Sequence, residues 1–251
     1  MLTGGRGFAS VVFDCDSTLV EVEGIDELAG ERIAEVRALT GAAMEGKIPL
    51  EEVYGRRLAL IRPSREQVEA VGHTYVRTLV EDARAVVSAL LALGKEVRVV
   101  SGGLRPPVEA VARELGLGAE AVAAVGIRFG PYGEYLDFEH DSPLARSRGK
   151  EEVIRAWNLP RPVLLVGDGA TDLEARPAAD VFAAYMGVAF RPAVAEGADV
   201  VLRARSLAPV LALAAGADDR EALSLSTREE LLAKGDRLLY AYSRNHTPTD
   251  R

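Results

Sequence analysis

Two carboxylates stand one residue apart in the segment Asp14-Cys-Asp-Ser-Thr18, directly after an apolar run. Acids this close repel each other unless a cation or a proton lies between them, and a turn at a strand end can aim both outward. The pattern therefore indicates a chemical site built on Asp14 and Asp16. A simple turn, in which Asp16 and Ser17 cap local backbone groups, is the alternative interpretation of these five residues alone.

A second pair of acids follows another apolar run, in Gly167-Asp-Gly-Ala-Thr-Asp172. Magnesium takes about six oxygen ligands and usually keeps several waters, so two or three carboxylates and a substrate phosphate make a sufficient set. Asp14 and Asp168 suit this set. On its own, the segment also fits an ordinary strand-to-helix turn with Asp172 in the first helical turn.

Two further segments could hold a phosphate group. Val99-Val-Ser-Gly-Gly103, followed by a proline, offers the Ser101 hydroxyl and the unhindered backbone N–H groups around Gly102 at the start of a helix. Lys150, at the start of another helical pattern, supplies a positive charge. Taken singly, Ser-Gly-Gly is often only a turn, a lone lysine is usually on the surface, and Arg148 competes with Lys150 for the role.

Three apolar runs predict the buried strands that position these residues: Phe8 to Asp14, Glu96 to Ser101 and Pro162 to Asp168. Their alternation with helical patterns is typical of an open parallel sheet flanked by helices, in which the carboxyl ends of the strands meet a ligand crevice. Before the second strand, a capping box at Thr78-Leu-Val-Glu81 predicts the start of a helix, and Gly94 predicts its end.

About sixty residues between the first strand and this helix are rich in Glu, Arg, Ala and Leu, with helical periodicity at 24–36 and 50–61. They predict a small helical cap, residues 20–77, inserted into a core domain made of residues 1–19 and 78–216. The expected fold class is α/β, a Rossmann-like doubly wound parallel sheet with a helical cap inserted after the first strand.

Two later segments complete the predicted organisation. Residues 127–138 are a hairpin candidate, because two alternating segments flank a Gly-Pro-Tyr-Gly turn. Residues 217–251 form a polar extension with one expected helix, Thr227 to Tyr240, and a frayed end at 245–251. Docking of this extension on the core and a contact between subunits are both open.

Composition narrows the class of protein. Of the 251 residues, 48% are hydrophobic, enough for a packed core, and the single cysteine, Cys15, excludes an internal disulfide and a cysteine-cluster metal site. With 38 acidic and 30 basic residues, the chain has no long-range attraction for nucleic acid or an anionic membrane. No run is long and apolar enough for a membrane span and the start lacks a secretion signal, so we expect a cytoplasmic monomer or homodimer without nucleic-acid or membrane partners.

The four polar segments, in this order over residues 8 to about 215, resemble the motifs of the haloacid dehalogenase superfamily of phosphotransferases. The resemblance implies that Asp14 attacks phosphorus and that Asp16 protonates the leaving oxygen and then activates water. It implies that Mg²⁺ is held by Asp14, the Asp16 backbone carbonyl and Asp168, with Asp172 acting from behind these ligands. Lys150 matches the third motif of the superfamily and would face the phosphate.

Three stretches of the expected cap, residues 21–29, 43–46 and 57–63, resemble phosphoserine phosphatases in order and spacing. The resemblance implies that Glu23 pairs with the substrate ammonium and that Arg57 grips its carboxylate, which suits the bidentate geometry of arginine. The remaining substrate contacts that it implies are Met44, Ser101, Gly102 and Thr171. Glu45 departs from the family pattern, which commonly has glycine directly after the methionine.

The expected activity is magnesium-dependent hydrolysis of O-phospho-L-serine, the last step of serine biosynthesis, through an aspartyl-phosphate. Transfer of the phosphoryl group from phosphoserine to homoserine is an alternative that the sequence leaves open. Another small phosphomonoester, such as a phosphorylated sugar or ethanolamine phosphate, is a further alternative substrate. A catalytically silent binding module is disfavoured because both acids of the first motif are intact.

Overall fold

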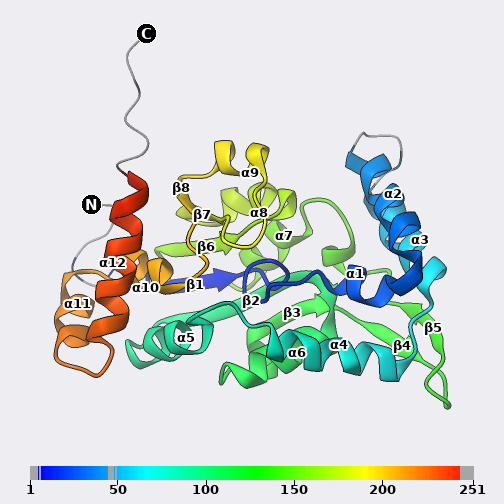
Figure 1. Cartoon of the computed structure of the whole chain (residues 1–251), viewed down its shortest axis with the longest axis horizontal. Coiled ribbons are helices and arrows are strands. Elements are labelled where there is room, and N and C mark those ends of the chain that lie inside the picture. The colour runs from blue at the N-terminus through cyan, green and yellow to red at the C-terminus, as the bar shows by residue number, and fades with distance from the viewer. Residues whose placement is uncertain (1–4, 6, 45–47, 49, 244–251) are drawn as a thin grey trace, which may run out of the picture.

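The computed structural model describes residues 5, 7–44, 48 and 50–243. At its centre lies a six-stranded sheet in which every neighbouring pair is parallel and the strand order is β3-β2-β1-β6-β7-β8 (Figure 1). The strands are β1 (Ser10–Phe13), β2 (Glu96–Leu104), β3 (Val122–Val125), β6 (Val163–Gly167), β7 (Val181–Tyr185) and β8 (Val200–Leu202). The three predicted strands are the three central ones, and the predicted α/β fold is confirmed.

The strand order reverses at β1. From β1 the chain first builds outward through β2 to β3, and it then returns to the other side of β1 to build β6, β7 and β8. Right-handed crossovers in opposite directions place helices on both faces of the sheet and open a crevice at the carboxyl ends of the strands beside the reversal. The crossover helices are α5 (Ala83–Ala92), α6 (Arg105–Glu114), α7 (Gly149–Ala156), α8 (Ala170–Ala175) and α9 (Pro192–Gly197).

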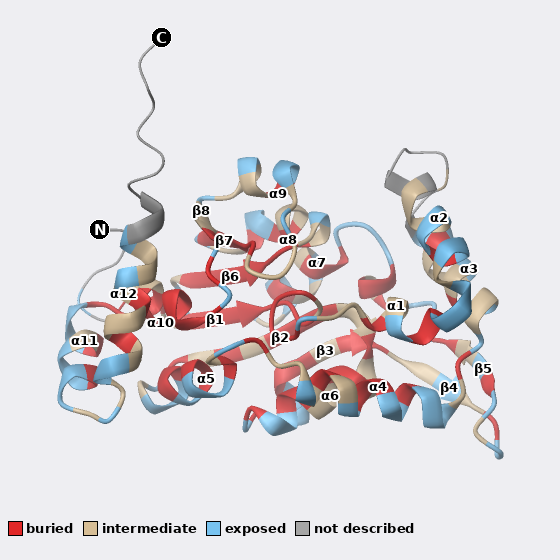
Figure 2. Ribbon diagram, in the orientation of Figure 1, coloured by how far each residue is buried: buried red, intermediate tan, exposed pale blue. Residues whose placement is uncertain are grey.

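The core lies in and around this sheet, as the buried colour of its strands shows (Figure 2). All four residues of β1 and all five of β6 are buried, which is why both were recognisable as continuous apolar runs. Among the described residues, no helix is long and apolar enough to cross a membrane.

Residues 20–77 contain helices α1 (Gly24–Ala29), α2 (Ile33–Met44), α3 (Leu50–Ile61) and α4 (Arg65–Arg77). The first three pack together at one end of the molecule, and α4 packs along α6 (Figure 1). Helix α4, which has no counterpart among the predicted helices, begins with a capping box. The Ser64 side chain accepts a hydrogen bond from Gln67 N at 3.2 Å, and the Gln67 side chain accepts one from Ser64 N at 2.8 Å.

The predicted capping box at residues 78–81 is wrong. Helix α5 starts only at Ala83, after Asp82 in a left-handed conformation. Residues 78–80 instead pair with the segment after β1, because Glu21 N donates to Thr78 O at 2.8 Å and Val80 N donates to Leu19 O at 2.9 Å. The chain therefore crosses between the sheet and residues 20–77 in two segments, 19–21 and 78–80, and these two crossings are hydrogen-bonded to each other.

The predicted hairpin is confirmed as β4 (Ile127–Phe129) paired antiparallel with β5 (Tyr135–Phe138), in a sheet of its own. It contacts the helices of residues 20–77. Arg65 N, at the start of α4, donates to Gly133 O at 2.8 Å, and the rings of Tyr54 and Phe138 lie 5.2 Å apart. The short helical turns of the chain are η1 (Gly30–Arg32), η2 (Ala119–Ala121), η3 (Pro143–Ala145) and η4 (Arg176–Ala178).

Three helices follow the last strand: α10 (Ala208–Ala214), α11 (Ala217–Ser224) and α12 (Glu229–Ser243). The sequence predicted the third but not α11. This part of the chain packs on the core through α10 and through a buried ion pair in which Lys95 Nζ lies 2.7 Å from Asp219 Oδ2. The predicted frayed end at 245–251 lies outside the described residues.

Candidate active site

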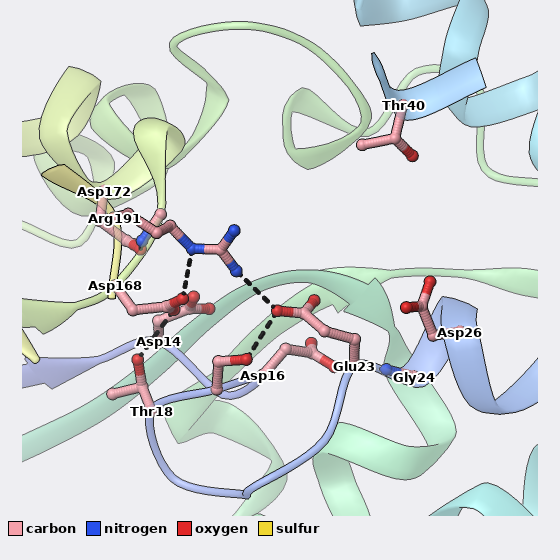
Figure 3. A network of polar contacts seen from close by, with 12 residues as sticks. Asp14, Asp16, Thr18, Glu23, Gly24, Asp26, Thr40, Asp168, Asp172 and Arg191 are labelled. Atoms are coloured by element: carbon pink, nitrogen blue, oxygen red, sulfur yellow. Dashed lines mark hydrogen bonds and ion pairs between the residues drawn. The ribbon is translucent and has the colours of Figure 1, made fainter. Parts of the chain in front are cut away.

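Three carboxylates converge at the carboxyl ends of the two central strands. Asp14 follows β1, Asp168 follows β6 and Asp172 lies in the first turn of α8, and one oxygen of each lies within 4.8 Å of the others (Figure 3). All three residues are buried. The parallel register forces this meeting, because Phe13 pairs with Val166 and the residues after both strands therefore leave the sheet at the same level.

Lys150 neutralises part of this cluster. Its Nζ lies 2.8 Å from Asp14 Oδ1 and 2.7 Å from Asp172 Oδ1, and only 4% of its side chain is exposed. Burial alone would lower the pKa of Lys150, but the two carboxylates raise it above its ordinary value, so the ammonium stays charged. The competing Arg148 has a side chain that is 72% exposed and pairs with Glu151, outside the site.

The carboxylates are held in place by their own hydrogen bonds. Asp14 Oδ1 accepts a bond from Cys15 N at 2.7 Å, and Asp172 Oδ2 accepts one from Gly169 N at 2.9 Å. Burial, followed by the charge of Asp172, raises the pKa of Asp14 well above its usual range, and Lys150 opposes the shift. Burial and Asp172 also raise the pKa of Asp168. A cation is therefore favoured beside both carboxyl groups.

Asp16 lies next to this cluster, and three donors hold its carboxylate. Gly24 N donates to Oδ1 at 2.8 Å, the Tyr75 hydroxyl also donates to Oδ1, and Ser101 Oγ donates to Oδ2 at 3.2 Å. Gly103 leaves room for this arrangement, since a Cβ there would lie 2.8 Å from Asp16 Oδ2. The predicted Ser101 loop and the first motif thus meet directly.

Glu23 and Arg191 form the second polar group of the site (Figure 3). Glu23, at the start of α1, accepts a hydrogen bond from Ser17 Oγ at 2.7 Å and pairs with Arg191 Nη2 at 2.9 Å. Arg191 Nε also lies 2.8 Å from Asp168 Oδ2, so one guanidinium bridges the two acids. Burial and the nearby charge of Asp16 raise the pKa of Glu23 to about 7.

Arg57, on α3, also lines the site. Its Nε is buried and has no hydrogen-bond partner among the described residues, and its Nη1 is 3.5 Å from Thr40 Oγ1. Its guanidinium lies 5.8 Å from the centre of the Tyr54 ring. Because burial lowers the pKa of Arg57 and a buried donor without a partner is unfavourable, an anion beside it would be stabilised.

A cavity of about 220 Å³ joins these groups. The predicted site residues that line it are Asp14, Asp16, Glu23, Arg57, Ser101, Gly102, Lys150, Asp168 and Thr171. Met44 ends α2, but its side chain and the departing residue Glu45 lie outside the described part of the chain. The structure thus brings together every predicted site residue whose side chain it describes.

Tyr75 and Arg191, which line the cavity and bond to the predicted acids, were not predicted as site residues. Arg191 directly precedes Pro192, at the start of the helix that follows β7. Its position in a loop after a parallel strand could have marked Arg191 as a site residue, but β7 was not recognised as a strand. Tyr75 lies near the end of α4, a helix that was also missed.

The donor set fits a hard divalent cation. Asp14 and Asp168 offer carboxylate oxygens on one side of the cavity, which is the ligand type that Mg²⁺ prefers, and the described residues of the cluster contain no histidine or thiol ligand. Both oxygens of Asp172 already bind protein groups, Lys150 and Gly169 N. Asp172 is therefore placed to orient Lys150 and the loop after β6.

Known proteins match both the sequence and the fold. A family model described as haloacid dehalogenase-like hydrolase matches residues 11–176. The chloroplastic phosphoserine phosphatase of Arabidopsis thaliana is 40% identical over 204 residues, which cover 77% of this chain and 68% of that protein. The phosphoserine phosphatase of Bos taurus is 40% identical over 195 residues, which cover 76% and 87%.

Among solved structures, a substrate-bound phosphoserine phosphatase complex superimposes with a TM-score of 0.68 at 30% identity, covering 81% of this chain and 96% of that one. Sequence, fold and the arrangement of acids and lysine thus agree. The chain belongs to the haloacid dehalogenase-like hydrolases and, within them, to the family of the phosphoserine phosphatases.

Proposed function

We propose that this protein hydrolyses O-phospho-L-serine to serine and phosphate through an aspartyl-phosphate on Asp14. One observation carries the proposal: a single cavity holds a buried carboxylate and lysine cluster beside Glu23 and Arg57. The cluster suits a phosphate group. Glu23 suits an ammonium group and Arg57 a carboxylate, and phosphoserine carries all three.

In the first step, an Asp14 oxygen forms a bond to phosphorus while the bond from phosphorus to the serine oxygen breaks. Among the described residues, Asp14 is bonded through Oδ1, to Cys15 N and Lys150, which leaves Oδ2 for attack. Asp16 gives a proton to the departing serine oxygen, and in the second step it takes one from the water that displaces Asp14. One residue can serve both steps because the first displacement needs a proton donor and the second needs a proton acceptor.

Lys150 and the Ser101–Gly102 loop would stabilise the oxygens of the transferred group. We propose Mg²⁺ as the cofactor, held by Asp14, Asp168 and the Asp16 carbonyl. When bound, it would supply positive charge to the phosphoryl oxygens. Asp172 keeps Lys150 in position from behind. Phosphoryl transfer of this kind depends on positioning and charge more than on covalent strain.

We also propose that residues 20–77 form a cap over a core of residues 1–19 and 78–216, and that the cap selects the substrate. Glu23 and Arg57, which belong to residues 20–77, line the cavity in support of this role; Thr171 lines it from the core, and Met44 stays a prediction from the sequence. A cytoplasmic location, a part in serine biosynthesis, and a monomeric or homodimeric state likewise stay predictions.

Phosphate release from a panel of phosphomonoesters with Mg²⁺ tests the activity. We expect phosphoserine to have the highest kcat/KM, and a preference for a sugar phosphate would contradict the proposal. Asp14→Asn should abolish release, with Asp141→Asn as the control because Asp141 is an exposed acid outside the cavity. An arm with homoserine, read as phosphohomoserine, distinguishes hydrolysis from transfer.

The substrate contacts are tested by matching variants to substrates. Arg57→Ala should raise the KM for phosphoserine about 10- to 100-fold, the loss of a charged hydrogen bond, but leave that for ethanolamine phosphate unchanged, since it has no carboxylate. Glu23→Gln should raise both. Arg56→Ala is the matched control, because the neighbouring arginine is exposed and pairs with Glu52 on the surface.

A further inference from the structure

A tyrosine outside the four motifs contacts the acid that serves both steps of the proposed reaction. Tyr75 lies on α4, is 1% exposed, and its hydroxyl donates a hydrogen bond to Asp16 Oδ1. Burial, followed by the charge of Asp16, raises the pKa of Tyr75 well above its usual range, so the hydroxyl keeps its proton. This hydrogen bond connects the end of α4 to the cavity.

The contact is closely packed. A Cβ added at Gly24 would overlap the Tyr75 hydroxyl and would lie 3.4 Å from Asp16 Oδ1. Gly24 N itself donates to the same oxygen at 2.8 Å. The hydroxyl, the Gly24 backbone and the Asp16 carboxylate therefore fill one small volume, and Asp16 cannot rotate without disturbing the other two.

The three donors to Asp16 come from different parts of the chain. Gly24 and Tyr75 lie just inside the two crossings that connect residues 20–77 to the sheet, and those crossings are bridged at Val20 and Leu79. Ser101, on β2, donates to the other oxygen. Oδ1 is thus fixed by Gly24 and Tyr75, while Oδ2 faces Ser101, in the part of β2 that would bind phosphate.

We propose that Tyr75 is a positioning residue of the phosphatase reaction, which fixes the Asp16 carboxylate so that Oδ2 exchanges the proton with the leaving oxygen. This inference rests on the proposed function. Among the described residues, Oδ1 accepts two hydrogen bonds and Oδ2 accepts one, from Ser101 Oγ, so Oδ2 is the oxygen with capacity to carry the proton. As the bond from phosphorus to the ester oxygen breaks, the proton on Oδ2 passes to that oxygen and Asp16 becomes a carboxylate.

The requirement for this proton depends on the leaving group. The serine oxygen leaves as a strongly basic alkoxide unless it is protonated, whereas p-nitrophenolate leaves without a proton. Tyr75→Phe should therefore lower kcat/KM for phosphoserine at least about 10-fold while changing kcat/KM for p-nitrophenyl phosphate less than about 3-fold. The ratio kcat/KM is the correct measure, because it excludes the later hydrolysis of the aspartyl-phosphate, which both substrates share.

Tyr185→Phe is the matched control. Tyr185 is also fully buried and its hydroxyl also donates a hydrogen bond, to Arg205 O at 2.7 Å, but it lies outside the residues that line the cavity. It should leave the ratio of the two kcat/KM values unchanged. If Tyr75→Phe does not fold, Gly24→Ala replaces it, since the added Cβ displaces the Tyr75 hydroxyl and should reproduce the selective loss.

An equal loss on both substrates in Tyr75→Phe, or no loss, would overturn the role of Tyr75. Failure of the wild-type protein to release phosphate from phosphoserine would instead overturn the proposed function. In that case the comparison is made between p-nitrophenyl phosphate and the alkyl phosphate that the panel identifies. The variant tests the role of Tyr75 and the wild-type protein tests the proposed function, so one set of assays tests the two conclusions separately.

Discussion

Lys150 is the charge on which the buried acids depend, and its replacement by methionine tests this directly. Methionine keeps an unbranched side chain of similar length and removes only the ammonium. The change leaves Asp14 and Asp172, whose oxygens lie 2.8 and 2.7 Å from Nζ, buried without their cation. The consequence should appear both in stability and in catalysis.

The magnitude follows from the burial of the group. Removing one partner of a buried ion pair costs about 3–5 kcal/mol, because the remaining charge stays desolvated. Exposed pairs are worth about 0–1 kcal/mol. We therefore expect Lys150→Met to lower the free energy of unfolding by about 3–5 kcal/mol at neutral pH with a chelator present. Loss of one stabilising donor should also lower kcat about 10²- to 10³-fold in protein that remains folded.

Lys234 provides a matched control within the same chain. Its Nζ also lies between two carboxylates, at 2.6 Å from Glu81 and 2.6 Å from Asp82, but 31% of its side chain is exposed compared with 4% for Lys150. Urea unfolding of Lys150→Met and Lys234→Met compares the two sites. Similar losses of stability, or a kcat within threefold of wild type for Lys150→Met, would refute the reasoning.

Three further predictions concern pH, the C-terminal helices and the metal. The pKa of Glu23 is raised on folding, from 4.5 to about 7, so its protonated form contributes stability that is complete below pH 4.5 and lost as the pH rises through 7. In chelator, the unfolding free energy of wild type should therefore fall more between pH 5 and 7.5 than that of Glu23→Gln, and parallel curves would contradict this. Asp219→Asn should lower the free energy of unfolding by about 3 kcal/mol, since it removes the carboxylate charge that lies 2.7 Å from the buried Lys95 Nζ; a change below 1 kcal/mol would contradict this. Removal of divalent ions should abolish phosphate release and Mg²⁺ should restore it, whereas full activity in chelator would exclude the proposed cofactor.

The sequence predicted the parts of the fold in which local and tertiary preferences agree. β1 and β6 are buried along their whole length and therefore appear as runs made mainly of valine, leucine and phenylalanine. β3 and β7 each contain two consecutive alanines, in Val-Ala-Ala-Val and Val-Phe-Ala-Ala-Tyr, and alanine carries little strand preference, while β8 has only three residues. They were missed for that reason.

The wrong capping box illustrates how tertiary pairing overrides a local pattern. Thr78 and Glu81 have the spacing of a box, but the backbone of residues 78–80 bonds to the segment after β1 and cannot also begin a helix. The true box, at Ser64 and Gln67, opens a polar helix whose buried residues, at positions 68, 71, 72 and 75, have helical spacing, so both signals were present in the sequence and were overlooked.

The site was predicted where a motif marks it and missed where only the fold does. Asp14 and Asp168 follow strands, Ser101 lies in the last part of β2 and Lys150 is in the first turn of α7, so their convergence follows from the parallel register. Tyr75 reaches the cavity only because the chain returns to the sheet beside the point where it left. No spacing of residues in the sequence predicts that return.

Arg191 links the two halves of the site in a way that follows from its contacts. Both oxygens of Asp168 have partners in the protein, since Thr18 donates to Oδ1 at 3.2 Å and Arg191 Nε to Oδ2 at 2.8 Å. A cation that uses Asp168 must share or replace one of these contacts. Because the same guanidinium pairs with Glu23 at 2.9 Å, movement of Arg191 away from Asp168 also changes the charge that faces a substrate ammonium. The proposed Mg²⁺ ligand Asp168 and the proposed ammonium contact Glu23 therefore share one side chain, Arg191.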